Sequence, residues 1–114
     1  MELYIAGGVG EHGRNCFFLQ NEGDAILVDC GLMAGSDDPQ PRLTENQIRK
    51  LKAVFLTHSH ADHTGALPWL LRQRYTGPII STTPTLQQLP FIVQNAVALE
   101  QVAPRNEKCN DITW

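Results

Sequence analysis

The sequence predicts a mixed α/β (α+β) fold in which helices pack on one mixed β-sheet. Two observations carry this prediction: three β-rich runs occupy the first 30 residues, and helical and strand-like segments then alternate to about residue 102. The chain has 114 residues, of which 42% are hydrophobic and 18% charged, as in ordinary globular proteins. We therefore expect residues 1–114 to form a single domain.

The first part of the chain is expected to be all β. Residues 2–6 (ELYIA) are typical of a strand. Residues 15–20 (NCFFLQ) and 25–30 (AILVDC) are joined by NEGD, a segment with an internal glycine, which predicts a hairpin. Residues 31–43 are rich in Gly, Pro and Asp without any period, and we expect a surface loop there.

Helical and strand signals alternate after this loop. Thr44 precedes Gln47 by three residues, and this capping-box pattern predicts a short helix over 44–51. Residues 53–57 (AVFLT) are a continuous apolar run of strand length, which predicts a strand buried on both faces. An amphipathic helix is expected over 65–75.

The remaining segments repeat the alternation. Residues 79–82 (IIST) predict another short buried strand. Residues 83–102 predict a helix that begins near Thr83 and that Pro90 either kinks or splits in two. Residues 103–114 show no strong pattern.

Charge and apolar runs limit the partners and the location. The net charge of −3 argues against a basic surface over the whole domain. No apolar run approaches the roughly 18 residues of a membrane-spanning helix, and no apolar leader segment follows the N-terminus. The three cysteines show no CxxC spacing, as is typical of reduced thiols. We expect a cytoplasmic protein without membrane contact.

Side chains that can bind a metal are concentrated in AVFLTHSHADHTGALP, residues 53–68. His58, His60, Asp62 and His63 place four donor side chains within six residues, between a strand and a helix. Imidazole and carboxylate groups are the ligands that zinc, manganese or iron accept. Alternate residues of an extended segment share a side, so His58 and His60 can bind one ion while Asp62 and His63 face a second. The competing interpretation, helix capping by surface histidines, does not explain so many donors.

These residues resemble a known family. THSHADHTGALP is similar to the H-x-H-x-D-H signature of the metallo-β-lactamase superfamily of metal-dependent hydrolases. ILVDCG resembles its strand-end aspartate motif, and GGVGEHGRNCFFL, GALPWLL and TTPT resemble the β-CASP branch of RNA-processing nucleases. The resemblance implies an αββα sandwich built from two similar halves, of which this chain supplies the first.

The resemblance also implies roles for individual residues. His58 and His60 would bind a first zinc ion, and Asp62 and His63 a second, with Asp62 also orienting the bridging hydroxide as a catalytic residue. Asp29 would be a buried residue that hydrogen-bonds the ligand loop.

Glycines on either side of the ligands have an expected role of their own. Gly31 and Gly65 would allow tight backbone approach beside the site.

The expected ligand set is incomplete. The family takes a third histidine for the first metal, a bridging aspartate and a last histidine from its second half, yet no histidine follows His63. His12 lies upstream in a Gly-rich loop and is expected to be exposed. Late candidate donors match no family motif: Glu100, Glu107, Cys109 and Asp111. With two ligands for each ion, we expect weak or partial zinc binding.

The expected function follows from this incompleteness. The chain is interpreted as an N-terminal fragment of a hydrolase in which a metal hydroxide attacks a phosphodiester, with RNA as the expected substrate, and the fragment itself is expected to be inactive or nearly so. Its unfinished core predicts self-association or binding of a complementing C-terminal half. Two alternatives stay open: a non-catalytic metal-binding module that self-associates, and a hydrolase of an ester, thioester or lactam.

Basic residues form two separate clusters in the sequence. One contains Arg42, Arg49, Lys50 and Lys52, and the other Arg72 and Arg74. In a nuclease such groups could meet a phosphate backbone. The competing interpretation is a pair of solvated helix faces.

Overall fold

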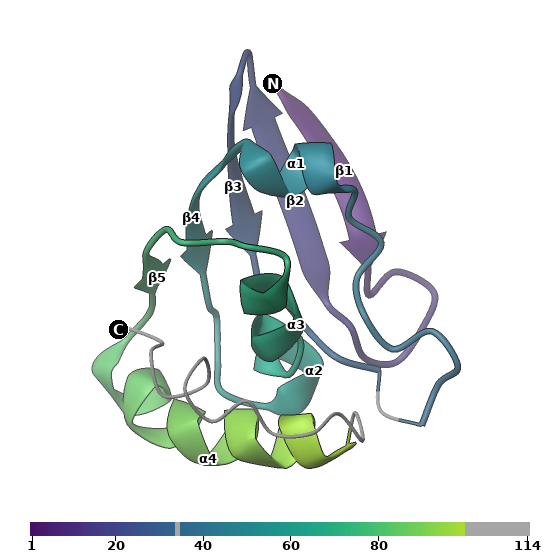
Figure 1. Cartoon of the computed structure of the whole chain (residues 1–114), viewed down its shortest axis with the longest axis vertical. Helices are drawn as coiled ribbons and strands as arrows, with labels where there is room; N and C mark the ends of the chain where they lie inside the picture. The colour runs from purple at the N-terminus through teal and green to yellow at the C-terminus, as the bar shows by residue number, and fades with distance from the viewer. Residues whose placement is uncertain (34, 100–114) are drawn as a thin grey trace.

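The computed structural model describes residues 1–33 and 35–99, which form one five-stranded mixed sheet with helices on it (Figure 1). The strands lie side by side in chain order: β1 (Glu2–Gly7), β2 (Cys16–Asn21), β3 (Asp24–Val28), β4 (Leu51–Phe55) and β5 (Ile79–Ile80). The first three strands are antiparallel, and β3, β4 and β5 are parallel. The predicted fold class is confirmed.

The predicted hairpin joins β2 to β3. Asn21 pairs with Asp24, so the turn has only two residues, Glu22 and Gly23. The glycine-containing segment NEGD was sufficient to predict this hairpin, because the register of a hairpin follows from the length of its loop.

Four helices accompany the strands: α1 (Glu45–Arg49), α2 (Ala61–Thr64), α3 (Leu67–Arg72) and α4 (Thr83–Leu99). The capping box of α1 is confirmed, since the Thr44 hydroxyl accepts from Gln47 N and the Gln47 side chain accepts from Thr44 N. Among the described residues, no helix has the length and apolar character needed to cross a bilayer.

Two helix predictions need correction. The helix expected over 65–75 is shorter, because α3 spans Leu67–Arg72 with Pro68 in its first turn, and a separate helix, α2, ends before it at Gly65. The helix expected from Thr83 is continuous through Pro90, so the split alternative is wrong within the described residues. Residues 100–102 of that prediction and the patternless tail 103–114 lie outside the described residues.

The loop expected over 31–43 has no helix or strand among its described residues, but its start is not at the surface. Gly31 and Leu32 are buried, and Leu32 N donates to the Ala61 carbonyl at 3.0 Å. The surface-loop prediction was therefore wrong at this end, because a long-range backbone bond holds it against α2.

One face of the sheet carries the core. Phe18, Leu27 and Val54 lie on it, each at most 1% exposed, and they pack with residues of α1, α3 and α4. Figure 1 shows α1, α2 and α3 on this side, with α4 beyond the ends of β4 and β5.

The opposite face is also apolar, but nothing among the described residues covers it. Cross-strand pairing aligns a row of side chains over all five strands: Ile5, Phe17, Val28, Phe55 and Ile80. We call this row and its neighbours Leu3, Leu19 and Ile26 the open apolar face.

Exposure along this face corrects the prediction made for 53–57. The strand runs over Leu51–Phe55, and Phe55 is 38% exposed on the open apolar face. An apolar run cannot distinguish a strand covered on both faces from one whose second cover lies outside the described residues. The prediction of an apolar strand was correct, but the prediction that both of its faces are buried was wrong.

Candidate metal centre

The histidine segment lies where the parallel strands β3 and β4 end, next to loop 29–32. Four backbone bonds join the two regions: Asp29 N to Phe55 O at 2.8 Å, Cys30 N to His63 O at 2.8 Å, Leu32 N to Ala61 O at 3.0 Å, and Ala66 N to Cys30 O at 2.9 Å. The carboxyl ends of parallel strands are the usual place for a site in open sheets. Here they carry the predicted ligand loop on a rigid support.

Two glycines permit the close approach of these backbones. A Cβ on Gly31 would overlap the carbonyl of Asp62, and one on Gly65 would lie 2.6 Å from Ala61 O. Real Cβ atoms do not approach this closely, so both positions require glycine or a shifted backbone. The predicted role of Gly31 and Gly65 is confirmed.

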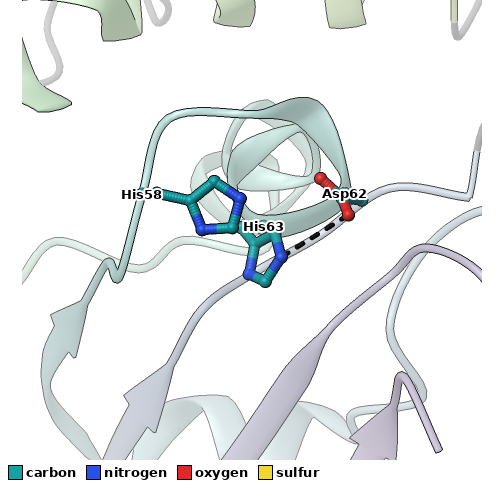
Figure 2. Close-up of side chains that lie close together, drawn as sticks. All are labelled: His58, Asp62 and His63. Carbon is teal, nitrogen blue, oxygen red and sulfur yellow. Dashed lines mark ion pairs between the residues drawn. The ribbon is translucent and has the colours of Figure 1, made fainter.

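Three of the four predicted donors converge on one point. The ligand atoms of His58, Asp62 and His63 all lie within 4.8 Å of one another (Figure 2). Nε2 of His63 is 3.5 Å from an Asp62 oxygen, and the rings of His58 and His63 have centroids 3.7 Å apart. This half-buried group contains His58, which was expected to bind the first ion with His60. It also contains Asp62 and His63, which were both expected to bind the second ion.

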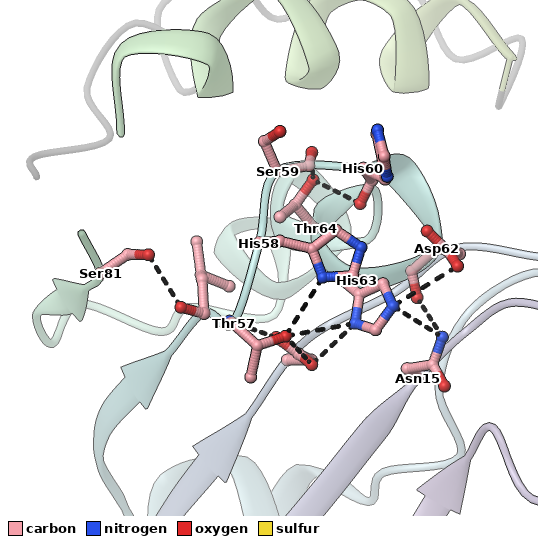
Figure 3. A network of polar contacts seen from close by, with 11 residues as sticks. Asn15, Thr57, His58, Ser59, His60, Asp62, His63, Thr64 and Ser81 are labelled. Carbon is pink, nitrogen blue, oxygen red and sulfur yellow. Dashed lines mark hydrogen bonds and ion pairs between the residues drawn. The ribbon is translucent and has the colours of Figure 1, made fainter. Parts of the chain in front are cut away.

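His60 lies apart from this group. Its ring points away from His63 (Figure 3) and meets the His58 ring edge-on, with centroids 5.1 Å apart. His60 immediately precedes α2, and its side chain is exposed. Its ligand role stays a prediction, as does the division of the four donors between two ions.

Asp29 orients His63 and the start of the ligand loop. One carboxylate oxygen accepts from Thr57 N at 2.8 Å, and the other accepts from the Thr57 hydroxyl and lies 2.8 Å from His63 Nδ1 (Figure 3). A carboxylate only accepts, so Nδ1 of His63 donates to Asp29, and in the neutral ring Nε2 then carries the lone pair and faces Asp62. Metal-binding histidines usually have such a partner on their second ring nitrogen.

The backbone of Asp29 is also unusual. Its φ of +65° lies in the left-handed region, and the residue is 3% exposed. Aspartate tolerates this conformation better than most residues, at some cost in energy. The conformation ends β3 and brings the carboxylate across to Thr57.

Asn15 is a site residue that sequence reasoning missed. Its backbone N and its Nδ2 both donate to Asp62 O at 2.9 Å, and its carbonyl accepts from Gly31 N. Nδ2 also lies 3.4 Å from His63 Nε2. No local pattern marks this residue, because it acts on a segment 47 positions away.

Arg14 anchors the loop that carries Asn15. The guanidinium is buried, bonds the Glu11 carboxylate at 2.6 Å and reaches Asp38 at 3.1 Å. The hydrogen bond from Arg14 lowers the pKa of Glu11 to about 2. His12, between them, is exposed as expected and lies outside the donor group.

The donor chemistry fits a metal ion. Two imidazoles and one carboxylate are the ligand types of zinc and of similar transition metals. The His63 tautomer set by Asp29 leaves the ligating nitrogen free of a proton. The late candidate donors Glu100, Glu107, Cys109 and Asp111 lie outside the described residues.

A family model described as metallo-beta-lactamase superfamily matches residues 9–107. The chain belongs to this superfamily. Members generally bind metal ions, and the group of His58, Asp62 and His63 could hold one. The predicted recognition is confirmed.

Curated relatives of the chain include proteins named as ribonucleases. Transcription termination factor FttA of Methanothermobacter thermautotrophicus is 43% identical over 88 residues, which are 73% of this chain and 14% of the relative. Probable RNase MJ4 of Methanocaldococcus jannaschii is 33% identical over 101 residues, which are 89% and 23%. Ribonuclease J of Mycoplasma genitalium is 40% identical over 81 residues, which are 63% and 14%. The chain thus spans less than a quarter of each.

Solved structures agree on the fold. The Rm3 metallo-beta-lactamase has a TM-score of 0.57 at 22% identity, with 77% of this chain and 32% of that chain covered. The short form of human tRNase Z has a TM-score of 0.52 at 22% identity, with 90% and 42% covered. Both share the superfamily's fold with this chain over part of their length.

Gly31→Ala tests the close contact at the site. We expect a loss of roughly 3 kcal/mol in the free energy of unfolding, because the added Cβ overlaps the Asp62 carbonyl and separates two backbones. Urea unfolding followed by circular dichroism gives the value. Gly23→Ala is the matched control, since nothing lies within 4 Å of its Cβ position. Equal stability of the two variants would contradict this account of the contact.

Proposed function

We propose that this chain carries metal ligands of a hydrolase that cleaves phosphodiester bonds in RNA, within the β-CASP branch of the superfamily. The observation that carries the proposal is the convergence of His58, Asp62 and His63, with His63 oriented by Asp29. Two relatives are named as ribonucleases, which supports the substrate.

Each side chain has a proposed role at the site. His58, Asp62 and His63 hold the ion, and His60 joins them by a change of rotamer, since its exposed ring is already close to that of His58. Asp62 accepts a hydrogen bond from the attacking water and so orients it. We propose zinc, which when bound supplies a Lewis acid and lowers the pKa of a coordinated water.

The number of donors determines how much this chain does by itself. Four side chains shared by up to two ions give two ligands each, whereas a catalytic zinc takes three protein ligands and a water. We propose that the missing ligands come from a complementing C-terminal half, which the short coverage of the relatives supports. The chain alone binds metal weakly and turns over little or no substrate.

The same half covers the open apolar face. A row of cross-strand pairs from Ile5 to Ile80 leaves large side chains exposed, including Leu3 at 58% and Ile5 at 46%. Contiguous apolar patches of this kind mark interaction surfaces. When the complementing half is absent, we propose that a second copy takes its place.

For location we propose the cytoplasm. Cys16 and Cys30 are present as buried thiols, which supports a reducing compartment.

Metal titration tests the proposed ligands. Calorimetric titration with zinc is expected to show binding that weakens about tenfold or more in His63→Ala and in His58→Ala, and less in His60→Ala, because His60 lies outside the converged group. His12→Ala is the control, as an exposed histidine of the same chain. Retention of wild-type affinity by His63→Ala would refute the proposed site.

A turnover assay tests the incomplete ligand set. With a labelled oligoribonucleotide and excess zinc, the 114-residue chain is expected to stay near the uncatalysed rate, because each ion lacks protein ligands. Robust cleavage by the chain that His60→Ala abolishes would overturn this expectation.

Light scattering tests the open apolar face. We expect the chain to self-associate with rising concentration and Phe55→Lys to shift it toward monomer, since the new charge lies within the row, between Val28 and Ile80. Phe91→Lys is the matched control, because Phe91 is 75% exposed on α4 and away from the sheet. A wild-type chain that stays monomeric at high concentration would count against the proposal.

A further inference from the structure

A hollow of about 800 Å³ lies at the edge of the sheet opposite the metal centre. It is bounded by α1, by the start of β4, by the end of α3 and by loop 73–77, which leads to β5. Figure 1 shows α1 at the other end of β4 from α2 and α4. The buried side chains of Ile48, Leu51 and Tyr75 contribute to its lining.

The rim of this hollow is basic. Arg49, Lys52, Arg72 and Arg74 line it, with Glu45 as the acidic residue among its lining side chains. Residues from two clusters at least 20 positions apart in the sequence thus share one concave surface, in a chain whose net charge is −3. We call it the basic hollow.

Two of these cations have only weak partners. Arg49 lies 3.4 Å from Glu45, and Lys52 lies 3.7 Å from Asp24, with all four side chains between 66% and 79% exposed. Ion pairs so open to solvent contribute little and exchange readily. They hold the cations near the hollow and leave them able to bind a stronger anion.

The backbone places Arg74 at the rim at a cost in energy. Its φ is +73°, and the bonds from Arg74 N to Leu71 O and from Tyr75 N to Leu70 O form the Schellman ending of α3. Glycine is the usual residue at this position, because a side chain is strained there. Strain held outside the metal centre points to a function for the side chain.

The loop after Arg74 is braced. The Tyr75 hydroxyl donates to Pro78 O at 2.5 Å, and burial raises the pKa of Tyr75 to about 12, so it remains a donor at neutral pH. A Cβ on Gly77 would lie 2.6 Å from that hydroxyl. A fixed rim reduces the ordering cost of binding.

We propose that the basic hollow binds consecutive phosphates of single-stranded RNA. Arginine forks match phosphate oxygens, and four cations spread over this volume exceed what one phosphate engages. Strand β4 has five residues, about 16 Å, between the hollow and the ligand loop, so the bound nucleotides lie several positions from the metal centre. The choice of RNA rests on the proposed function, whereas binding at the basic hollow requires no metal.

Fluorescence anisotropy with a labelled 12-nucleotide oligouridylate, in EDTA and low salt, tests the binding. The double variant Arg49→Gln/Arg74→Gln is expected to weaken Kd about tenfold and to lower the slope of log Kd against log salt by about 1.4, or 0.7 for each charge removed. Arg42→Gln is the matched control, an exposed arginine outside the hollow, and should change Kd less than about twofold.

Arg74→Gly separates binding from folding. Glycine relieves the left-handed strain, so the melting temperature should rise by several degrees, while Kd for the oligonucleotide weakens several-fold. A merely structural Arg74 would give the rise without the loss of affinity, and that result would overturn the proposal. So would equal affinity of the double variant and Arg42→Gln, or displacement of the oligonucleotide by inorganic phosphate at equal phosphate concentration.

Discussion

The carboxylate of Asp29 links the sheet to the histidine segment. Buried at the end of β3, it bonds both the backbone and the hydroxyl of Thr57 and lies against His63 Nδ1. A buried carboxylate is stable only when such partners satisfy it. These contacts fix where the ligand loop leaves β4 and which nitrogen of His63 faces Asp62, so the donor geometry depends on them.

Backbone contact completes the unit. Loop 29–32 and segment 61–66 exchange several hydrogen bonds, and Gly31 lets Asp62 O come close enough to accept from Asn15. The donor group therefore forms from residues of this chain alone. The open apolar face differs, since no described residue covers it. A formed ligand group beside an uncovered sheet is what one half of a sandwich would present.

Short sequence patterns predicted the features that depend only on residues close together in the chain. The hairpin turn, the capping box at Thr44 and the spacing of the histidines could all be read directly. Long-range contacts decided the rest. The sequence could not show that Asn15 reaches Asp62, or that Phe55 lies open on one face, because each depends on how segments distant in the chain pack.

Anomalous diffraction from crystals grown with zinc, measured on both sides of the zinc absorption edge, tests the central claim most directly. The account predicts a peak about 2.0–2.2 Å from Nε2 of His63 and from an oxygen of Asp62, with His58 completing the contact. A zinc peak that avoids His63, with full occupancy elsewhere on the chain, would contradict it.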